Sequence, residues 1–461
     1  MRTTCTAVVF SVAVVLACGG GGGGSTDRGA VELPSDDVPL VDIVQADPEV
    51  AGGEDRLDPG FEFPAQDPGG SDAASEAAPE PGNLDVATDP GPDPGGNPCP
   101  RLPGPDDRVR RIVVSHPYDA SGSKANAFEV LDLSEEGEIS TGGATFSMGR
   151  AFFSGIAFTP DGEVGILAQE DGSLGVFRVD GTGGVTVVHA ALKGSFYAAR
   201  VVMDPAGDRA WVLDSQWREN GGGIYAVRIG CDGSLTEEGL VAPAKLAQAM
   251  AFVPDGSGRV VVPADDILDS SPGLDTHLLQ WGSKPEVLGG ASMFPDGEAM
   301  VVSLAVTGDG KYVLAGDNSE FSGIPNRVGV ASLKEGKLVP VQVLTPILDP
   351  VALVASPFGD SVIAVSGYGN SVRVLVLDAG SAAAPIADAG PPEWVGKKPE
   401  LPGAAVPILR GKLKGMVILS ENLGVRRLRF DGNGKVVDLG RTVTAAGEEY
   451  PGIVGAIGVQ P

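Results

Sequence analysis

The chain has 461 residues and a formal charge of −28, and it is rich in Gly (68) and Pro (37). A negative balance of this size repels phosphate backbones, so we expect no nucleic-acid partner. Only three His and four Cys are present, which leaves little material for a His- or Cys-rich metal site. Abundant Gly, Pro and Val with few helical apolar stripes favour an all-β fold of short strands and turns.

Residues 1–17 have the pattern of an export signal. The apolar run over residues 7–17 is too short to cross a bilayer comfortably. It ends in VLAC at residues 15–18, which resembles a bacterial lipoprotein lipobox. The resemblance implies cleavage before Cys18, lipidation of this residue and attachment to a membrane of the bacterial cell envelope through its acyl chains. The alternative is an ordinary secretory signal with an incidental Cys18. Gly19 favours the outer membrane by analogy with lipoprotein sorting.

Residues 18–107 are predicted to be a disordered tether. Residues 27–107 hold 20 acids against 3 Arg, and residues 25–107 hold 15 Pro and two aromatic residues. A segment of this composition cannot bury enough apolar surface to offset the entropy lost on ordering. Its reach as a flexible coil is roughly 50 Å, which would hold a globular part away from a membrane. Its Asp-Pro-Gly repeats also permit divalent-cation binding, but a solvated spacer is the favoured interpretation.

Two cysteines remain if Cys5 is removed with the signal and Cys18 is lipidated. These are Cys99, at the end of the tether, and Cys231, in an expected hairpin. An exported protein favours a disulfide between them, worth about 2–4 kcal/mol. Two free thiols are the alternative.

Residues 108–461 repeat one four-residue turn between a small or apolar run and a β-branched run. Pro stands where its fixed φ suits the second position, and Gly closes the turn. The turns are Thr159–Gly162, Asp204–Gly207, Val253–Gly256, Thr307–Gly310 and Ser356–Gly359. A unit of about 50 residues with up to four strands is typical of a propeller blade. Full blades are expected to begin near residues 155, 198, 249, 299, 351 and 404.

The two ends of this region predict a seventh, composite blade. Residues 109–148 supply three strands without an innermost one, and residues 453–461 supply one strand with nothing after it. Pairing them would close the ring and leave no open seam between blades. A further turn at Phe294–Gly297 is interpreted as a connection from an outer strand to the next inner strand.

The repeats resemble those of the YVTN/lactonase-like seven-bladed β-propellers. The nearest match is TGDGKYVLAGD at residues 307–317, and the resemblance covers about residues 108–461. Strand–PDG–strand repeats also suit TolB-type propellers, whereas the dipeptides of WD repeats are absent. This chain departs from the pattern at Gly308, where Pro is expected, and at residues 410–412 in the last blade. The resemblance allows lactonase or other hydrolase activity at the mouth of the central channel.

In propellers, the connections from second to third strands share a face with those from fourth to first strands. Trp217 and Arg218 are the candidate anchors for a partner there, because Trp and Arg are enriched at binding hot spots. Tyr368, Asp317 and Asn318 are further binding candidates. The competing interpretation is that Trp217 only covers the edge of a blade.

Carboxylates in the same connections could hold Ca²⁺, which takes six to eight oxygen ligands. The candidates are Asp265, Asp266, Asp317 and Glu421, although such residues are commonly solvated loop residues. His116 could act as a base beside Asp119, although a lone His in a turn is more often only exposed.

These observations lead to two hypotheses. The first is a monomeric, non-enzymatic propeller of the bacterial cell envelope that binds a protein or glycan and needs no cofactor. The second is a lactonase or other hydrolase. No nucleophile elbow or phosphate-binding glycine loop supports the second, and propellers host both kinds of function.

Overall fold

The computed structural model describes two short strands near the N-terminus and most of residues 101–461. The described residues are 6–10, 13–17 and 101–461, with gaps at 107, 119–122, 152–154, 193–195, 215–221, 269–272, 283, 295–298, 320–325, 368, 379, 382 and 445–453. Strands β1 (Thr6–Phe10) and β2 (Ala13–Ala17) form an antiparallel pair within the predicted signal peptide. The predicted tether up to residue 100 lies outside the described residues. Across the described ranges, no helix has the length and hydropathy needed to cross a bilayer.

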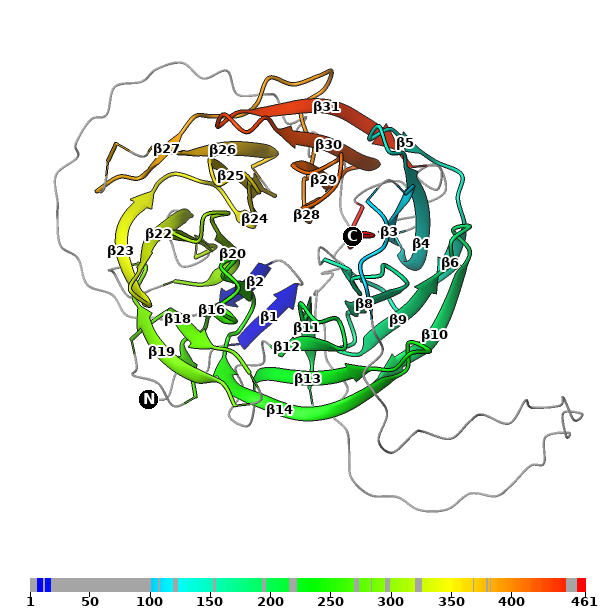
Figure 1. Cartoon of the computed structure of the whole chain (residues 1–461), viewed down its shortest axis with the longest axis horizontal. Coiled ribbons are helices and arrows are strands. Elements are labelled where there is room, and N and C mark those ends of the chain that lie inside the picture. The colour runs from blue at the N-terminus through cyan, green and yellow to red at the C-terminus, as the bar shows by residue number, and fades with distance from the viewer. Residues whose placement is uncertain are drawn as a thin grey trace, which may run out of the picture. The chain divides into compact units, whose positions relative to one another are not determined.

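The remaining strands form seven antiparallel sheets arranged around a ring, which confirms the predicted seven-bladed β-propeller (Figure 1). The strands of each blade are given from the inner strand outwards. Blade 1 consists of β32 (Ile457–Val459), β3 (Arg110–Tyr118), β4 (Lys124–Leu133) and β5 (Ile139–Ser140), and β6 (Thr145–Ser147) also pairs with β4. Blade 2 consists of β7 (Ala157–Phe158), β8 (Val164–Ala168), β9 (Leu174–Val179) and β10 (Val185–Leu192). Blade 3 consists of β11 (Ala198–Met203), β12 (Arg209–Asp214), β13 (Gly223–Ile229) and β14 (Leu235–Lys245). Blade 4 consists of β15 (Ala251–Phe252), β16 (Arg259–Pro263), β18 (Thr276–Gln280) and β19 (Glu286–Ala291).

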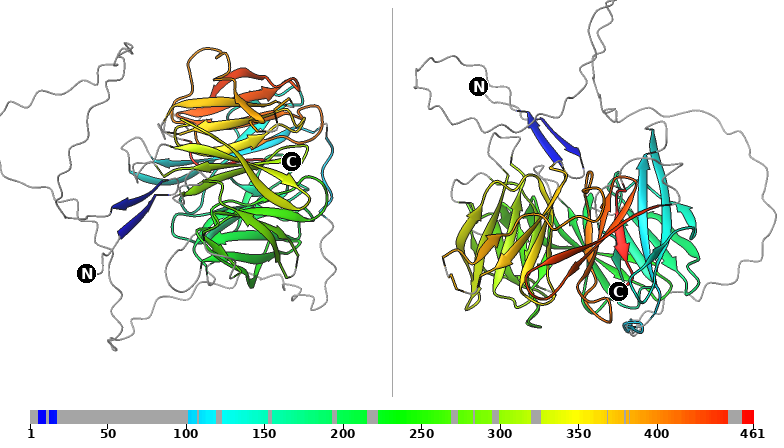
Figure 2. Two further views of the ribbon diagram at one scale, coloured as in Figure 1. Left: turned by 90° about the vertical axis from the view of Figure 1, so that its left-hand side faces the viewer. Right: turned by 90° about the horizontal axis from the view of Figure 1, so that it is seen from above.

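Blades 5 to 7 follow the same order from the middle of the ring to its rim. Blade 5 consists of β20 (Val301–Val306), β21 (Tyr312–Asp317), β22 (Arg327–Lys334) and β23 (Lys337–Leu344). Blade 6 consists of β24 (Pro350–Ala355), β25 (Ser361–Ser366), β26 (Ser371–Leu377) and β27 (Ile386–Asp388). Blade 7 consists of β28 (Ala405–Pro407), β29 (Met416–Glu421), β30 (Gly424–Phe430) and β31 (Val436–Val443). Figure 2 shows these sheets from two sides, standing next to one another around the ring.

The core lies between the blades. Seven clusters of buried apolar side chains each join two neighbouring blades, so every seam of the ring has its own core. The second strands β8, β25 and β29 are buried along their whole length, because neighbouring blades cover both of their faces. The fourth strand β14 instead alternates between half-buried and exposed residues over most of its length. Continuous apolar runs for second strands and alternating runs for outer strands follow from this arrangement.

The composite blade is confirmed, with the last strand of the chain completing the first sheet. Ile112 pairs with Val459, and Val114 pairs with Ile457, in the antiparallel register of β3 and β32. Ile156 of the next blade also donates its N–H to the Ile457 carbonyl at 2.8 Å. Arg108 Nη2 adds a link by donating to the Pro461 oxygen at 3.1 Å. The two ends of the domain therefore close the ring by backbone pairing.

Two of the repeated turns, at Thr159 and Thr307, have the same internal pattern of hydrogen bonds. In the turn at Thr159, the Oγ1 atom donates to Asp161 Oδ1 at 2.5 Å and accepts from Val164 N at 3.1 Å. In the turn at Thr307, the same atom donates to Asp309 Oδ1 at 2.7 Å and accepts from Tyr312 N at 3.0 Å. Asp161 Oδ1 also accepts from Glu163 N at 2.9 Å, and Asp309 Oδ1 accepts from Lys311 N at 3.1 Å, so the Thr-x-Asp-Gly sequence shared by these two turns forms the same contacts in both.

Blade 4 contains a feature that the sequence did not indicate. Its second-to-third-strand connection holds a short strand, β17 (Asp266–Ile267), which pairs with the outer strand β14 of blade 3.

Phe294 lies between β19 and β20, which confirms that its turn belongs to an outer-to-inner connection. The outer edge of blade 6 is formed by the three-residue strand β27.

We expect Gly256→Ala to lower the free energy of unfolding by about 1–2 kcal/mol, because Gly256 adopts φ 72° where a side chain is strained. No atom beyond its neighbours lies within 4 Å of an added Cβ there, so the cost is one of backbone conformation alone. Urea denaturation measures this change. Gly289→Ala in the same blade is the matched control, since that site is equally open and has no positive φ. It should be neutral or slightly stabilising. Equal effects at the two sites would contradict this explanation of the turns.

Candidate functional site

We define the loop face as the face that carries the second-to-third-strand and fourth-to-first-strand connections. The predicted anchors Trp217 and Arg218 belong to the connection between β12 and β13, and Tyr368 follows β25. These three residues lie outside the described residues, so their roles stay predictions. The described part of the loop face consists of the strand ends from which these connections leave.

Asp317, at the end of β21, is buried in an internal ion pair. Its Oδ2 atom accepts from Arg327 Nε at 2.8 Å, and its Oδ1 atom accepts from Met300 N at 2.7 Å. The Arg327 guanidinium also stacks 4.6 Å from the centroid of the Phe294 ring. The Asp317 carboxylate is 0% exposed and ties β21 to β22 and to the segment before β20. It therefore acts as a structural brace of blade 5.

Asn318 joins blade 5 to blade 6. Its Nδ2 atom donates to Asp349 Oδ1 at 2.8 Å, and both side chains are buried. Asp349 directly precedes β24, so this bond links the second-to-third connection of one blade with the first strand of the next. Asn318, which was predicted to bind a partner, thus forms a buried hydrogen bond between two blades.

Glu421, at the end of β29, occupies the equivalent position in blade 7. Its Oε2 atom accepts from Arg426 Nε at 2.8 Å, and Arg426 Nη1 donates to Asp438 Oδ2 at 2.6 Å. Arg426 is 1% exposed and also donates to the Lys397 carbonyl at 2.7 Å. Burial raises the pKa of Glu421, while Arg426 and Arg441 oppose this shift. The network joins three strands across the width of the blade.

Blade 1 carries a related pair. His116 lies inside β3 rather than in the loop expected from the sequence, and it is 2% exposed. Its Nε2 atom lies 3.3 Å from Glu129 Oε2 on β4, and Glu129 is equally buried. The predicted neighbour Asp119 lies outside the described residues. Buried polar pairs thus recur near the ends of second strands in three blades.

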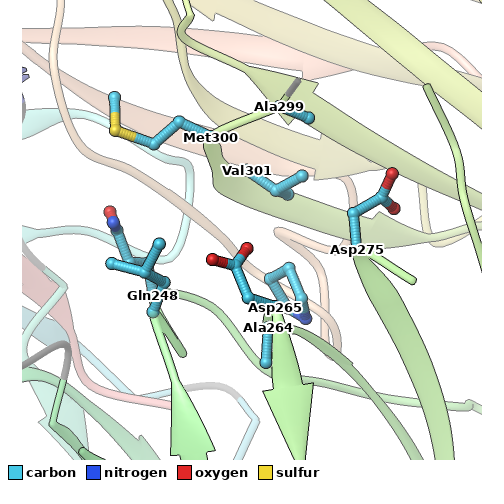
Figure 3. Close-up of a pocket in the computed structure, with 9 residues that line it drawn as sticks. Gln248, Ala264, Asp265, Asp275, Ala299, Met300 and Val301 are labelled. Carbon is cyan, nitrogen blue, oxygen red and sulfur yellow. The ribbon is translucent and has the colours of Figure 1, made fainter. Parts of the chain in front are cut away.

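A small cavity lies between blade 4 and blade 5 on the loop face (Figure 3). Asp265 and Asp275 line it, together with Val301, and its volume is about 10 Å³, about the room of one water molecule. Asp265 is exposed as a residue, but surrounding protein atoms still desolvate its carboxylate and, with the neighbouring Asp275, raise its pKa. Burial likewise raises the pKa of Asp275, against hydrogen bonds from Met293 N and Phe294 N.

The four predicted Ca²⁺ ligands are distributed over three blades. Asp266 lies on β17, where its Oδ2 atom is 3.6 Å from Lys245 Nζ, and Asp265 precedes it. Asp317 and Glu421 lie in blades 5 and 7. Within the described part of the chain, no three or more His, Cys, Asp or Glu side chains are grouped to hold a metal ion. The structure therefore does not gather these four residues into one site.

Cys231 lies in the turn between β13 and β14 and is disulfide-bonded. Cys99 and Cys18 lie outside the described residues. The pairing of Cys99 with Cys231 therefore stays a prediction.

Sequence comparison identifies no relative: no protein-family profile and no curated protein matches the chain. Solved structures match it in fold. A Bacteroides fragilis protein described as a proposed 6-phosphogluconolactonase superposes with a TM-score of 0.52 at 13% identity, over 77% of this chain and 99% of that one. The periplasmic gluconolactonase of Pseudomonas aeruginosa superposes with a TM-score of 0.51 at 15% identity, over 75% and 98%. At such low identity these superpositions show a likeness of fold alone.

We expect Arg426→Met to lower the free energy of unfolding by about 3–5 kcal/mol, because it leaves the buried Asp438 carboxylate without its cation and the buried Glu421 carboxylate with only Arg441, whose Nε atom lies 3.4 Å away. Chemical denaturation measures this change. Lys412→Met is the control, since Lys412 pairs with Glu135 at 2.8 Å but is 65% exposed. Its cost should be at most about 1 kcal/mol. Similar costs for the two variants would show that the buried network is not a brace.

Proposed function

We propose that this chain is a lipid-anchored platform of a bacterial cell envelope, which binds an envelope protein through the loop face. Cys18 supplies the anchor, the outer membrane is its site, and the acidic segment 18–107 spaces the propeller from the lipid. The anchor and the location rest on the sequence pattern of residues 1–19.

One observation carries the binding proposal: the described polar residues at the strand ends of the loop face are engaged inside the protein. Asp317 and Glu421 are each 0% exposed and paired with arginine. These ion pairs fix strand ends in blades 5 and 7. The candidate anchors Trp217 and Arg218 belong to blade 3, where the buried Asp214 at the end of β12 accepts from Tyr197 N at 3.0 Å, and Tyr368 belongs to blade 6. A rigid scaffold that presents variable loops is the usual arrangement of a binding surface.

A second candidate function is lactone hydrolysis. Asp265 and Asp275 are neighbouring carboxylates with raised pKa values at a loop-face cavity, which is an arrangement suited to general acid–base chemistry. Two proteins of the same fold are named for gluconolactone or phosphogluconolactone hydrolysis. The cavity in its present form holds about one water molecule and no sugar lactone, so this candidate requires the site to open.

Site-specific photo-crosslinking tests the binding proposal. A photoreactive amino acid at position 217 of the full chain should capture a discrete envelope protein in the producing bacterium. Trp217→Ala should then weaken binding of the purified partner at least about tenfold, as expected for a central aromatic anchor. The control position is Val339 on the outer strand β23, which is 46% exposed and far in sequence from the loop-face anchors.

Equal capture from positions 217 and 339, or unchanged affinity of Trp217→Ala, would refute the loop-face platform. Hydrolysis of glucono-δ-lactone by the full chain, lost in Asp265→Asn, would instead favour the second candidate. The two readouts use the same purified protein and separate binding from catalysis.

A further inference from the structure

The seam between blades 3 and 4 contains an open groove on the side opposite the loop face. Its volume is about 640 Å³, within the range of small-molecule sites. Trp211, Leu240, Phe252 and Trp281 line it with apolar surface, and Arg209 and Glu238 lie on its wall. We call it the seam groove, and it is independent of the proposed loop-face function.

The groove exists because one turn does not close over the preceding blade. In blade 7 the turn from third to fourth strand lies against blade 6, where Gly434 N donates to Asp360 Oδ2 at 2.7 Å. In blade 3 Gly233 of the corresponding turn lies against Val164 of blade 2. In blade 4 the turn from third to fourth strand contains Gly282, and no atom except those of its neighbours lies within 4 Å of a Cβ added there. The seam is therefore left open at this point.

Two indole side chains in the groove have unused hydrogen-bond donors. Trp211 and Trp281 are 5% and 9% exposed and contact each other edge to face, with ring centroids 5.0 Å apart. Each Nε1 atom exposes less than 1 Å², and no hydrogen-bond partner is found for it among the described residues. Indole N–H is a donor only, and an unmatched buried donor carries a desolvation cost. A ligand in the groove reaches these two donors by a rotation of the indole rings, and an acceptor on the ligand then removes this cost.

The charges around the groove already balance one another. Arg209 Nε donates to Glu238 Oε2 at 2.7 Å, and Arg228 Nε donates to Glu238 Oε1 at 2.8 Å. Asp204 caps its own turn by accepting from Ala206 N at 2.8 Å. No carboxylate or guanidinium among these is left to hold an ionic ligand. The groove therefore favours an uncharged molecule.

We propose that the seam groove binds an uncharged saccharide of one or two rings. Sugar hydroxyl oxygens can accept from the two indole N–H groups, and their protons can be donated to the Glu238 carboxylate. The C–H faces of a sugar ring can pack against Phe252 and Leu240, the latter 45% exposed. A purely apolar ligand would leave both indole donors unmatched, and an ionic ligand would find no free counter-charge.

Titration of the full chain with cellobiose, maltose and N,N′-diacetylchitobiose tests this site by calorimetry and tryptophan fluorescence. At least one sugar should bind saturably. Trp281→Phe keeps an aromatic ring but removes one N–H donor, and it should weaken binding about tenfold, the value of one hydrogen bond. Trp394→Phe, outside the groove and stacked on Arg426, should bind as the unmodified chain does.

Leu240→Arg separates loss of binding from loss of folding. Leu240 is exposed, so the longer arginine side chain can fill the groove without disturbing the core. It should abolish sugar binding while the urea midpoint stays unchanged. No saturable binding of any of the three sugars up to about 10 mM would overturn the proposal. Sugar binding that is unchanged in both Trp281→Phe and Leu240→Arg would overturn the proposal too. So would binding of a leucine-rich peptide in the groove when none of the three sugars binds.

Discussion

The pairing of β32 with β3 is the constraint on which the rest of the ring depends. Three residues, Ile457–Val459, supply the inner strand of blade 1, and Ile457 and Val459 also belong to the apolar cluster between blades 7 and 1. Without them β3 would present an unpaired edge, and the core of one seam would meet water. Since each blade is held only by its two neighbours, an open seam weakens the whole ring. The remote ends of the domain thus act as one element.

The polar groups of the loop face serve the same purpose. Asp317 with Arg327 and Glu421 with Arg426 lock second strands to third strands, at a long connection in blade 5 and at a two-residue hairpin in blade 7. Buried ion pairs add little net stability but are costly to break, so they favour one arrangement of the strand ends. Under the two proposals, a partner binds to the connections on one face, and a saccharide binds in the seam groove on the other.

The seven blades, their turns and the composite closure could be predicted because each follows from local patterns: turns that contain Pro and Gly, buried apolar runs and a last strand with no strand after it. The roles of Asp317 and Glu421 could not, because their partners Arg327 and Arg426 lie on the next strand, and no local pattern shows that both members of each pair are buried. Asp275, β17 and the unmatched indoles of Trp211 and Trp281 were also missed. These depend on how neighbouring blades meet, which no local pattern encodes.

Removal of the last strand tests the closure most directly. A chain that ends at residue 453 should unfold at a markedly lower urea concentration than the full chain. Its Ser115 amide, which in the full chain donates to the Ala456 carbonyl at 2.9 Å, should lose protection from hydrogen exchange. An unchanged midpoint together with a protected Ser115 amide would show that the ring does not depend on β32.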